Sequence, residues 1–369
     1  MKLAFGAIAA LAATQAYAYP SSSTLKVSHT GLLCSRGDCE AGSTIGAEIK
    51  GVSNFTTLTE DDIAFIRNVM NEYKVIYFSG AGKLMDPETQ LAFARRFGSV
   101  YPTVSKVPEY VEKGVHQSKH SVRHDTHDRQ GDETEGFENS INTMVEANKA
   151  ENKFWKGARM PKEVARLVRE PGDPFAFGEG YHADVTFYDE PPFFTFLVAR
   201  ELPGDRDDTF FIDVSKAYET LEQPIKDEIT GTMAYHNDSA GKVAVHPFVR
   251  THPETGVQSI YVNSHFTHGI LGYEESEAKS LLDKVFDHVE SQPIFKFKWT
   301  CDVEALGTKN PDCMHALMWD NRQLQHTATT DWAFDKNFNE RRRELHRVTI
   351  SGDERPFYRS SHSSCTEQA

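Results

Sequence analysis

The amino-acid sequence predicts a mainly β fold with flanking helices, of the β-sandwich or jelly-roll type. Apolar segments of strand length recur through the second half of the chain, and turn residues separate them. Helical patterns precede this series and interrupt it in only a few places. Many short strands with long connections favour two sheets that pack around one core, with a site at the open end between the sheets.

The region before residue 100 predicts a helix-flanked entry to the sheet. Thr59 followed by Asp62 is a capping signal for a helix, and Gly98 is a typical residue to end one. The run 74–78 is apolar throughout, which predicts a buried strand. The expected elements are a strand at 47–49, a helix at 59–73, a strand at 74–78 and a helix at 86–97.

The region after residue 165 carries the main strand series. Its segments combine aromatic and β-branched residues with two-residue alternation, the pattern of strands. The expected strands are 193–202, 208–212, 243–251, 259–262, 295–299 and 316–319, and the expected helices are 215–221 and 274–289.

Length and charge limit the kind of protein. A chain of 369 residues with ordinary composition can bury a full core, and we expect one domain over residues 45–358. Within it, the polar stretch 104–160 reads as an insertion, and 359–369 as a flexible tail. A formal net charge of -14 argues against a nucleic-acid or anionic-membrane partner, because both attract basic surfaces.

The N-terminus resembles a secretory signal peptide. Lys2 precedes an apolar run, and Ala16-Tyr17-Ala18 fits a small-x-small cleavage site, so residues 1–18 are expected to be removed. Residues 19–44 then form an N-terminal arm. The apolar run is too short to span a membrane, and no later segment is long enough. These features predict a secreted protein or one of the secretory lumen.

The cysteines and sequons agree with an oxidising compartment. Five cysteines include two close pairs, Cys34 with Cys39 and Cys301 with Cys313, which are candidates for local disulfides, and Cys365 is left over. Metal binding by these thiols is the other interpretation, although they lack the tight spacing of zinc sites. Asn54 and Asn237 begin N-x-S/T sequons, which are candidate glycosylation sites on surface loops.

The strongest chemical signal is His182-Ala183-Asp184 at the head of an apolar segment. We expect residues 180–187 to form a strand, in which His182 and Asp184 would face the same side. An imidazole and a carboxylate suit Fe(II), and a second histidine would complete a facial triad with open coordination positions. His326 follows an apolar strand and a turn, and is the candidate for that histidine.

Two arginines near the C-terminus predict an anionic ligand. In a strand, Arg343 and Arg347 would share a face with Leu345. Two guanidinium groups in one pocket repel each other unless they are solvated or meet anions, so a dicarboxylate or another anion is expected there. The other interpretation is a basic run on the surface, 341–343, whose charges are balanced by Glu340 and Glu344.

At this point the chain resembles a known family over residues 45–104 and 165–358. It is similar to the TauD/TfdA family of non-haem Fe(II), 2-oxoglutarate-dependent dioxygenases. The matching landmarks, in order, are His182-Ala183-Asp184-Val185-Thr186-Phe187, Glu201-Leu202-Pro203, Asp208-Thr209, residues 246–253, Val262-Asn263 with Phe266, Trp319-Asp320-Asn321-Arg322 before His326, and His346-Arg347-Val348-Thr349-Ile350.

The resemblance implies a double-stranded β-helix core (jelly roll, cupin-like) and a set of site residues. His182, Asp184 and His326 would bind Fe(II), and 2-oxoglutarate would chelate it, with its distal carboxylate on Arg343 and the Thr209 hydroxyl. The implied substrate residues are Arg347, for an anionic head, and Phe266, as an aromatic wall.

The implied reaction is hydroxylation of a small sulfonate- or carboxylate-bearing substrate with O2, releasing succinate and CO2. One departure from the family is spacing: sixteen residues, rather than about ten, separate His326 from Arg343, and the motif at 346–349 fixes the register. Two alternatives stay open, namely the same chemistry on a larger natural-product intermediate with 104–160 as a lid, or a secreted non-catalytic jelly-roll binding protein. The oligomeric state, including a homo-oligomer, is left open.

Overall fold

The computed structural model describes most of the chain but leaves out several stretches. The described residues are 20, 22–29, 32–35, 38–41, 45–101, 160–171, 178, 180–202, 208–238, 242–297, 299, 315–328, 342–352 and 354–360. Of the expected features, the signal peptide at 1–18, nearly all of the insertion at 104–160, and Cys301, Cys313 and Cys365 lie outside these residues.

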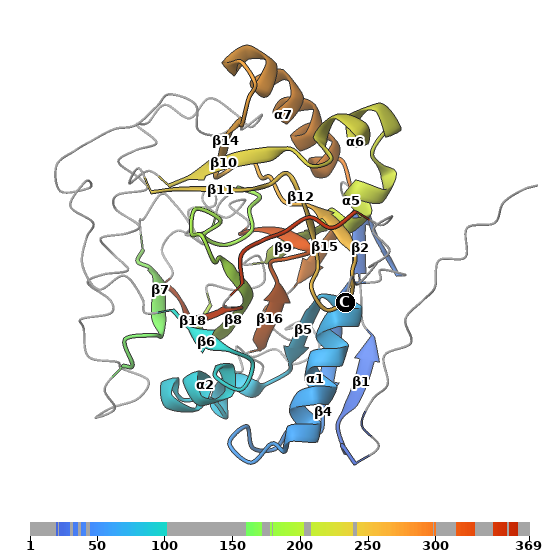
Figure 1. The fold of residues 1–369 in the computed structure, drawn as a ribbon. Coiled ribbons are helices and arrows are strands. Elements are labelled where there is room, and N and C mark those ends of the chain that lie inside the picture. The colour runs from blue at the N-terminus through green and yellow to red at the C-terminus, as the bar shows by residue number, and fades with distance from the viewer. Residues whose placement is uncertain are drawn as a thin grey trace, which may run out of the picture.

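The described chain is mainly β with flanking helices, as the sequence predicts (Figure 1). The strands are β1 (Lys26–His29), β2 (Leu32–Ser35), β3 (Asp38–Ala41), β4 (Ala47–Lys50), β5 (Val75–Phe78), β6 (Ser99–Val100), β7 (Ala165–Arg169), β8 (Pro192–Glu201), β9 (Thr209–Asp213), β10 (Met233–Asn237), β11 (Val243–Pro247), β12 (Val249–Thr251), β13 (Gln258–Ile260), β14 (Thr267–Ile270), β15 (Ile294–Phe297), β16 (Ala316–Asp320), β17 (Leu324–Ala328) and β18 (Arg343–Ser351). The helices are α1 (Glu60–Tyr73), the 3-10 turn η1 (Ala81–Lys83), α2 (Pro87–Ala94), α5 (Val214–Thr220), α6 (Gln223–Ile229) and α7 (Glu275–Glu290).

Two large sheets carry the fold. The first has the strand order β1-β4-β5-β16-β8-β18-β6, with β7 also paired to β18, and the second has the order β17-β9-β15-β2-β3. Neighbours in both sheets are antiparallel, apart from the parallel pair β4 and β5. Two smaller sheets, β11-β10-β14 and β12-β13, lie beside them. Strands form in every segment of the expected series from 193 to 319, with 243–251 divided into β11 and β12. The strands β1, β2, β3, β6, β7, β10, β14 and β17 and the helix α6 were not predicted.

One apolar cluster fills the space between the two large sheets. It takes residues from β5, β7, β8, β16 and β18 on one side and from β9, β15 and β17 on the other. Within β16, Leu317 and Trp319 belong to this cluster, whereas Ala316 and Met318 belong to a different one. The two-residue alternation of a strand thus buries both faces of the first sheet, which explains why its central strands are apolar throughout.

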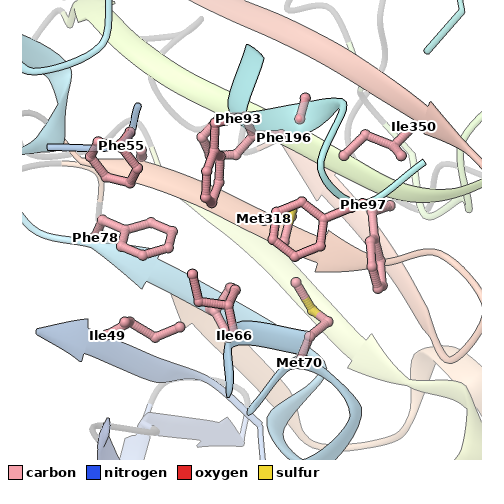
Figure 2. Packing of buried hydrophobic residues seen from close by; sticks show 14 of the residues in the cluster. Ile49, Phe55, Ile66, Met70, Phe78, Phe93, Phe97, Phe196, Met318 and Ile350 are labelled. Carbon is pink, nitrogen blue, oxygen red and sulfur yellow. The ribbon is translucent and has the colours of Figure 1, made fainter. Parts of the chain in front are cut away.

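A second cluster lies between the first sheet and helices α1 and α2 (Figure 2). Phe93 from α2 contacts Phe196 from β8 with ring centroids 5.3 Å apart, and Ile66 and Met70 come from α1. Helix α1 starts where the sequence predicts, since Thr59 and Asp62 form a reciprocal capping box. Helix α2 ends at Ala94, three residues before the predicted end.

The N-terminal arm contributes strands rather than a separate loop. β1 pairs with β4, β2 pairs with β15, and Cys34 stands opposite Cys39 in the β2–β3 hairpin. At the other end, the backbone of Arg359, which begins the expected tail, donates to the Thr251 hydroxyl at 2.9 Å. Asn54 is exposed, whereas Asn237 is the last residue of a strand and not in a loop. Among the described helices, none combines the length and apolar character needed to cross a bilayer.

Candidate metal centre

His182 and His326 are held side by side by their backbones. His326 is in the middle of β17, and His182 forms an isolated antiparallel bridge with it. The His182 amide donates to the His326 carbonyl at 3.0 Å, and the His326 amide donates to the His182 carbonyl at 2.9 Å. Since directly opposite residues of an antiparallel pair project to the same side, the two imidazoles meet, with ring centroids 4.4 Å apart.

Asp184 reaches the same point from a turn and not from a strand. The expectation of a strand over 180–187 was wrong: only His182 forms a bridge, and residues 184–187 are turn. Val185 has a φ of 41°, a left-handed conformation that a β-branched residue adopts only when its surroundings force it. Ala183 is buried, and Val185 and Phe187 are only partly buried, so the apolar pattern of this segment resembles that of a strand although the segment forms a turn.

His182, Asp184 and His326 form one buried cluster. His182 Nε2 lies 3.8 Å from Asp184 Oδ1, and His326 Nε2 lies 4.0 Å from Asp184 Oδ2. One ligand atom from each residue lies within 4.8 Å of the other two, and no second group of this kind occurs among the residues that the structure describes. Two imidazole nitrogens and a carboxylate oxygen are a donor set that fits Fe(II) and leaves coordination positions open.

Neighbouring groups direct the two imidazoles toward the carboxylate. Nδ1 of His182 lies 2.6 Å from the Gly180 carbonyl and donates to it, which leaves Nε2 as the lone-pair nitrogen that faces the cluster. The His326 ring packs against Trp319, with centroids 4.5 Å apart, and against Phe211, with centroids 5.9 Å apart. Both rings are therefore fixed with Nε2 inward.

The protonation states favour a cation at this point. Burial lowers the pKa of His182 to about 4 and also lowers that of His326. Burial alone would raise the pKa of Asp184, but His326, Arg347 and a hydrogen bond from Thr195 lower it overall. At neutral pH the cluster therefore consists of two neutral imidazoles and one carboxylate, the state in which these side chains bind a divalent metal.

A cavity beside the cluster contains the residues expected to bind 2-oxoglutarate. It is lined by Leu167, Gly178, His182, Asp184, Leu197, Thr209, Trp319, His326, Ala328, Arg343, Leu345 and Arg347. Arg343 and Leu345 face the cavity from β18, as the alternation of that strand predicts. Trp299 Nε1 donates to Thr209 Oγ1 at 2.9 Å, and because an indole nitrogen can only donate, the Thr209 hydroxyl proton points elsewhere.

Sequence reasoning missed one arginine beside this cavity. Arg169 on β7 stands directly opposite Arg343 on β18 and is 3% exposed, so both guanidinium groups are on the same face of the sheet. The alternation Ala165, Leu167, Arg169 carried the signal, since Leu167 lines the cavity and Arg169 is two residues further along.

The two expected substrate residues contact different members of the metal cluster. Arg347 Nη1 is 3.5 Å from Asp184 Oδ1, so this guanidinium is next to the metal carboxylate. The Phe266 ring stands edge-on to His182, with centroids 5.7 Å apart, and packs against Phe187 at 5.0 Å. The structure thus brings together all seven residues that the sequence selected, from segments as far apart as residues 182 and 347.

Among known proteins, the chain is similar in sequence to 2-oxoglutarate-dependent dioxygenases and to an alkylsulfatase. A Saccharomyces cerevisiae alpha-ketoglutarate-dependent sulfonate dioxygenase is 29% identical over 186 residues, and an Acinetobacter baylyi alkylsulfatase is 25% identical over 335 residues, which cover 84% of this chain and 83% of that protein. The chain spans less than half of the length of two fungal relatives, 46% of a Schizosaccharomyces pombe protein and 42% of the S. cerevisiae enzyme, whose match covers 46% of this chain.

Solved structures confirm the fold class. The crystal structure of a taurine dioxygenase from Burkholderia xenovorans superposes with a TM-score of 0.58 over 85% of this chain and 89% of that one, at 24% identity. A likeness at this identity supports the expected jelly-roll core and leaves the activity to other observations. The family model for the taurine catabolism dioxygenase TauD, TfdA family matches residues 38–349, which is most of the chain. The chain therefore belongs to the TauD/TfdA family.

Proposed function

We propose that this protein is an Fe(II)- and 2-oxoglutarate-dependent dioxygenase that hydroxylates a small anionic organic substrate with O2 and releases succinate and CO2. The observation that carries the proposal is the convergence of His182, Asp184 and His326 in a buried cluster that opens onto a cavity lined by Thr209 and Arg343. In this proposal the cluster holds the iron, and the cavity holds the cosubstrate.

The cosubstrate end of the cavity is suited to a carboxylate. Arg343 is 4% exposed and supplies a buried cation, and the Thr209 hydroxyl has a proton to donate because Trp299 already supplies its accepted hydrogen bond. Leu167, Leu197 and Leu345 form apolar walls along the carbon chain. A buried guanidinium gains most from a ligand that meets it with two oxygens, which a carboxylate does.

The substrate end is suited to an anion with an apolar body. Arg347 is beside the metal cluster with its side chain 17% exposed, and Phe266 supplies an aromatic surface next to His182. The names of the relatives support this substrate class, since they include a sulfonate dioxygenase, an alkylsulfatase and a 2,4-dichlorophenoxyacetate dioxygenase. All three names describe compounds that carry a sulfonate, sulfate or carboxylate group.

In the proposed mechanism the bound iron, with 2-oxoglutarate and O2, supplies the oxidising chemistry. The protein orients the cosubstrate and the substrate and keeps water away from them. His182 and His326 keep lone-pair nitrogens inward, Arg343 fixes one end of the cosubstrate, and Arg347 fixes the anionic head of the substrate, so that one C–H bond faces the metal. Trp319 and the leucines of the cavity exclude water from this region.

We also propose that the protein enters the secretory pathway and carries a Cys34–Cys39 disulfide. Residues 1–18 have the pattern of a signal peptide, and the two cysteines are cross-strand partners in the β2–β3 hairpin. Mass spectrometry of the protein from its native host would test both points: a mature chain that begins at Tyr19 with a Cys34–Cys39 cross-linked peptide is expected. An intact Met1 and reduced thiols would contradict the proposal.

Anaerobic titration with Fe(II) and 2-oxoglutarate tests the proposed function. Chelation of iron by the keto acid produces a weak visible charge-transfer band, which we expect in the wild-type protein. Asp184→Ala should abolish the band. In Arg343→Ala the band should appear only at higher concentrations of 2-oxoglutarate. Succinate release can then be measured with sulfonates, alkyl sulfates and carboxylates. A well-folded wild-type protein with no band would favour the non-catalytic binding protein.

A further inference from the structure

The sequence Trp319-Asp320-Asn321-Arg322 contacts the metal ligands, although the proposed chemistry does not use most of it. It forms the end of β16 and the turn into β17, the strand that carries His326. The Trp319 ring packs on His326, and its indole nitrogen donates to Asn321 Oδ1 at 3.0 Å. The same Asn321 oxygen accepts from the Asp184 amide at 3.2 Å.

A chain of hydrogen bonds continues from this turn to the Asp184 carboxylate. Asn321 Nδ2 donates to Thr195 Oγ1 at 2.9 Å, and Thr195 Oγ1 donates to Asp184 Oδ2 at 2.5 Å. The direction of both bonds is fixed, because the amide nitrogen can only donate and an ionised carboxylate can only accept. The single hydroxyl proton of Thr195 therefore points at Asp184 Oδ2.

Distance alone does not decide which oxygen of Asp184 binds a metal. Oδ1 lies 3.8 Å from His182 Nε2, and Oδ2 lies 4.0 Å from His326 Nε2, which is nearly the same separation. Arg347 Nη1 lies 3.5 Å from Oδ1, which is a long ion-pair contact, whereas the Thr195 hydroxyl donates to Oδ2 at 2.5 Å, so Oδ2 accepts the stronger hydrogen bond. This hydrogen bond occupies one acceptor direction of Oδ2 and fixes the plane of the carboxylate.

We propose that Thr195 is a positioning residue that keeps Asp184 Oδ2 as a hydrogen-bond acceptor and presents Oδ1 as the single metal-binding oxygen. Asn321 orients the Thr195 hydroxyl for this purpose. The inference rests on the proposed function, because it assumes that His182, Asp184 and His326 hold the metal. It deepens that proposal by assigning a role to two residues that do not touch the metal.

The turn that carries Asn321 is rigidly attached, so the arrangement is set before a metal arrives. The Asp320 amide donates to the Lys74 carbonyl at 2.9 Å, and the Asn321 amide donates to the Phe193 carbonyl at 2.8 Å. Thr195 has no exposed surface, and Asn321 is 2% exposed. Partners of this kind commonly change metal affinity by about 10–100-fold when they are removed.

Metal binding by matched variants tests the inference. Thr195→Val keeps the shape of the side chain and removes the hydroxyl, whereas Thr195→Ser keeps the hydroxyl. Metal-free proteins are titrated with Mn(II), and free Mn(II) is followed by its electron paramagnetic resonance signal. We expect affinity to fall about 10–100-fold in Thr195→Val. Thr195→Ser should bind close to wild type, and the spectrum of bound Mn(II) should change in Thr195→Val only.

A control variant separates positioning from stability. Thr251→Val removes a buried threonine hydroxyl that accepts a backbone hydrogen bond from Arg359 at 2.9 Å, outside the metal cluster. It should lower the unfolding temperature and leave Mn(II) affinity unchanged. If Thr195→Val does not fold, Thr195→Ala takes its place with the same expectation.

The outcomes are distinguishable. Wild-type protein that binds neither Mn(II) nor Fe(II) with 2-oxoglutarate would overturn the proposed function. Wild-type protein that binds Mn(II), together with a folded Thr195→Val that binds it equally well and with the same spectrum, would overturn the role of Thr195 and leave the proposed function intact. Loss of affinity in Thr195→Ser as large as in Thr195→Val would also overturn that role.

Discussion

Arg342 and Arg343 are adjacent in the sequence but make contacts on different sides of the sheet. Arg342 donates to Glu170 at 2.9 Å and to Glu201 at 2.8 Å, and its Nη1 lies 2.6 Å from a Glu344 oxygen. Arg343 lines the cavity with Thr209. The alternative interpretation of a basic surface run therefore describes Arg342, while Arg343 has the position expected for a cosubstrate arginine.

Replacement of Arg343 should weaken 2-oxoglutarate binding strongly. Arg343→Ala removes a buried cation from the cavity, and loss of one partner of a buried charge pair costs about 2–5 kcal/mol, or roughly 30-fold or more in affinity. The charge-transfer band of the anaerobic complex measures this. Arg342→Ala is the matched control, and equal losses in both variants would contradict the assignment of Arg343.

Replacement of Thr209 should affect both cosubstrate binding and stability. Thr209→Val removes the hydroxyl that accepts from Trp299 Nε1, and a buried donor left without a partner costs about 1–3 kcal/mol. We expect a lower unfolding temperature and 2-oxoglutarate binding that is weaker by about tenfold or more, because a hydrogen bond to a charged carboxylate, which contributes about 1.5–3 kcal/mol, is lost as well. Thr209→Ser should retain both properties. Unchanged cosubstrate binding in Thr209→Val would exclude the hydroxyl as a ligand.

Replacement of Asp320 should destabilise the fold more than most single changes. Asp320 has no exposed surface and accepts from Arg322 Nη2 at 2.7 Å and from His252 Nε2 at 3.1 Å. Asp320→Ala would leave the buried Arg322 without its main counter-charge, which typically costs about 3–5 kcal/mol. Urea unfolding measures the change. For comparison, Lys279→Ala breaks the exposed pair with Asp283, and such pairs contribute about 0–1 kcal/mol.

Stability of the metal-free protein should fall as the pH is lowered from about 6.5 to about 4. Burial lowers the pKa of His182, His315 and His346 to about 4. Between these pH values the unfolded chain binds protons that the folded protein does not, so unfolding becomes more favourable, by about 1.4 kcal/mol per pH unit for each such histidine. Above pH 6.5 this contribution should be constant.

A single variant checks the histidine contribution. His346 accepts from Arg200 Nε at 3.0 Å and donates to Glu344 Oε1 at 2.9 Å, so it is held as the neutral form. Glutamine can also accept and donate, and it does not titrate. Urea unfolding of His346→Gln from pH 4 to pH 7 should show a shallower dependence than wild type. An identical dependence would mean that His346 titrates alike in the folded and unfolded states.

The sequence by itself determined the class of the fold and most of the site. Continuous apolar runs of strand length identified the central strands, because both faces of the first sheet are buried. The capping residues fixed the start of α1 because they act within one helical turn. His182, Asp184, His326, Arg343 and Arg347 stood out because their residue types suit a metal and an anion, whereas Thr209 and Phe266 were implied by the resemblance to the TauD/TfdA family.

Only the tertiary structure decided how these residues meet. The segment 184–187 forms a turn with a left-handed Val185, because packing around the cluster outweighs the strand preference of its residues. Thr195 gave no recognisable signal, and the sequence signals at Arg169 and Asn321 did not show what these residues contact. Arg169 lies opposite Arg343, and Asn321 joins Thr195 to Asp184, which are contacts between segments distant in the sequence. Local patterns specify elements, whereas contacts distant in sequence specify which side chains share a site.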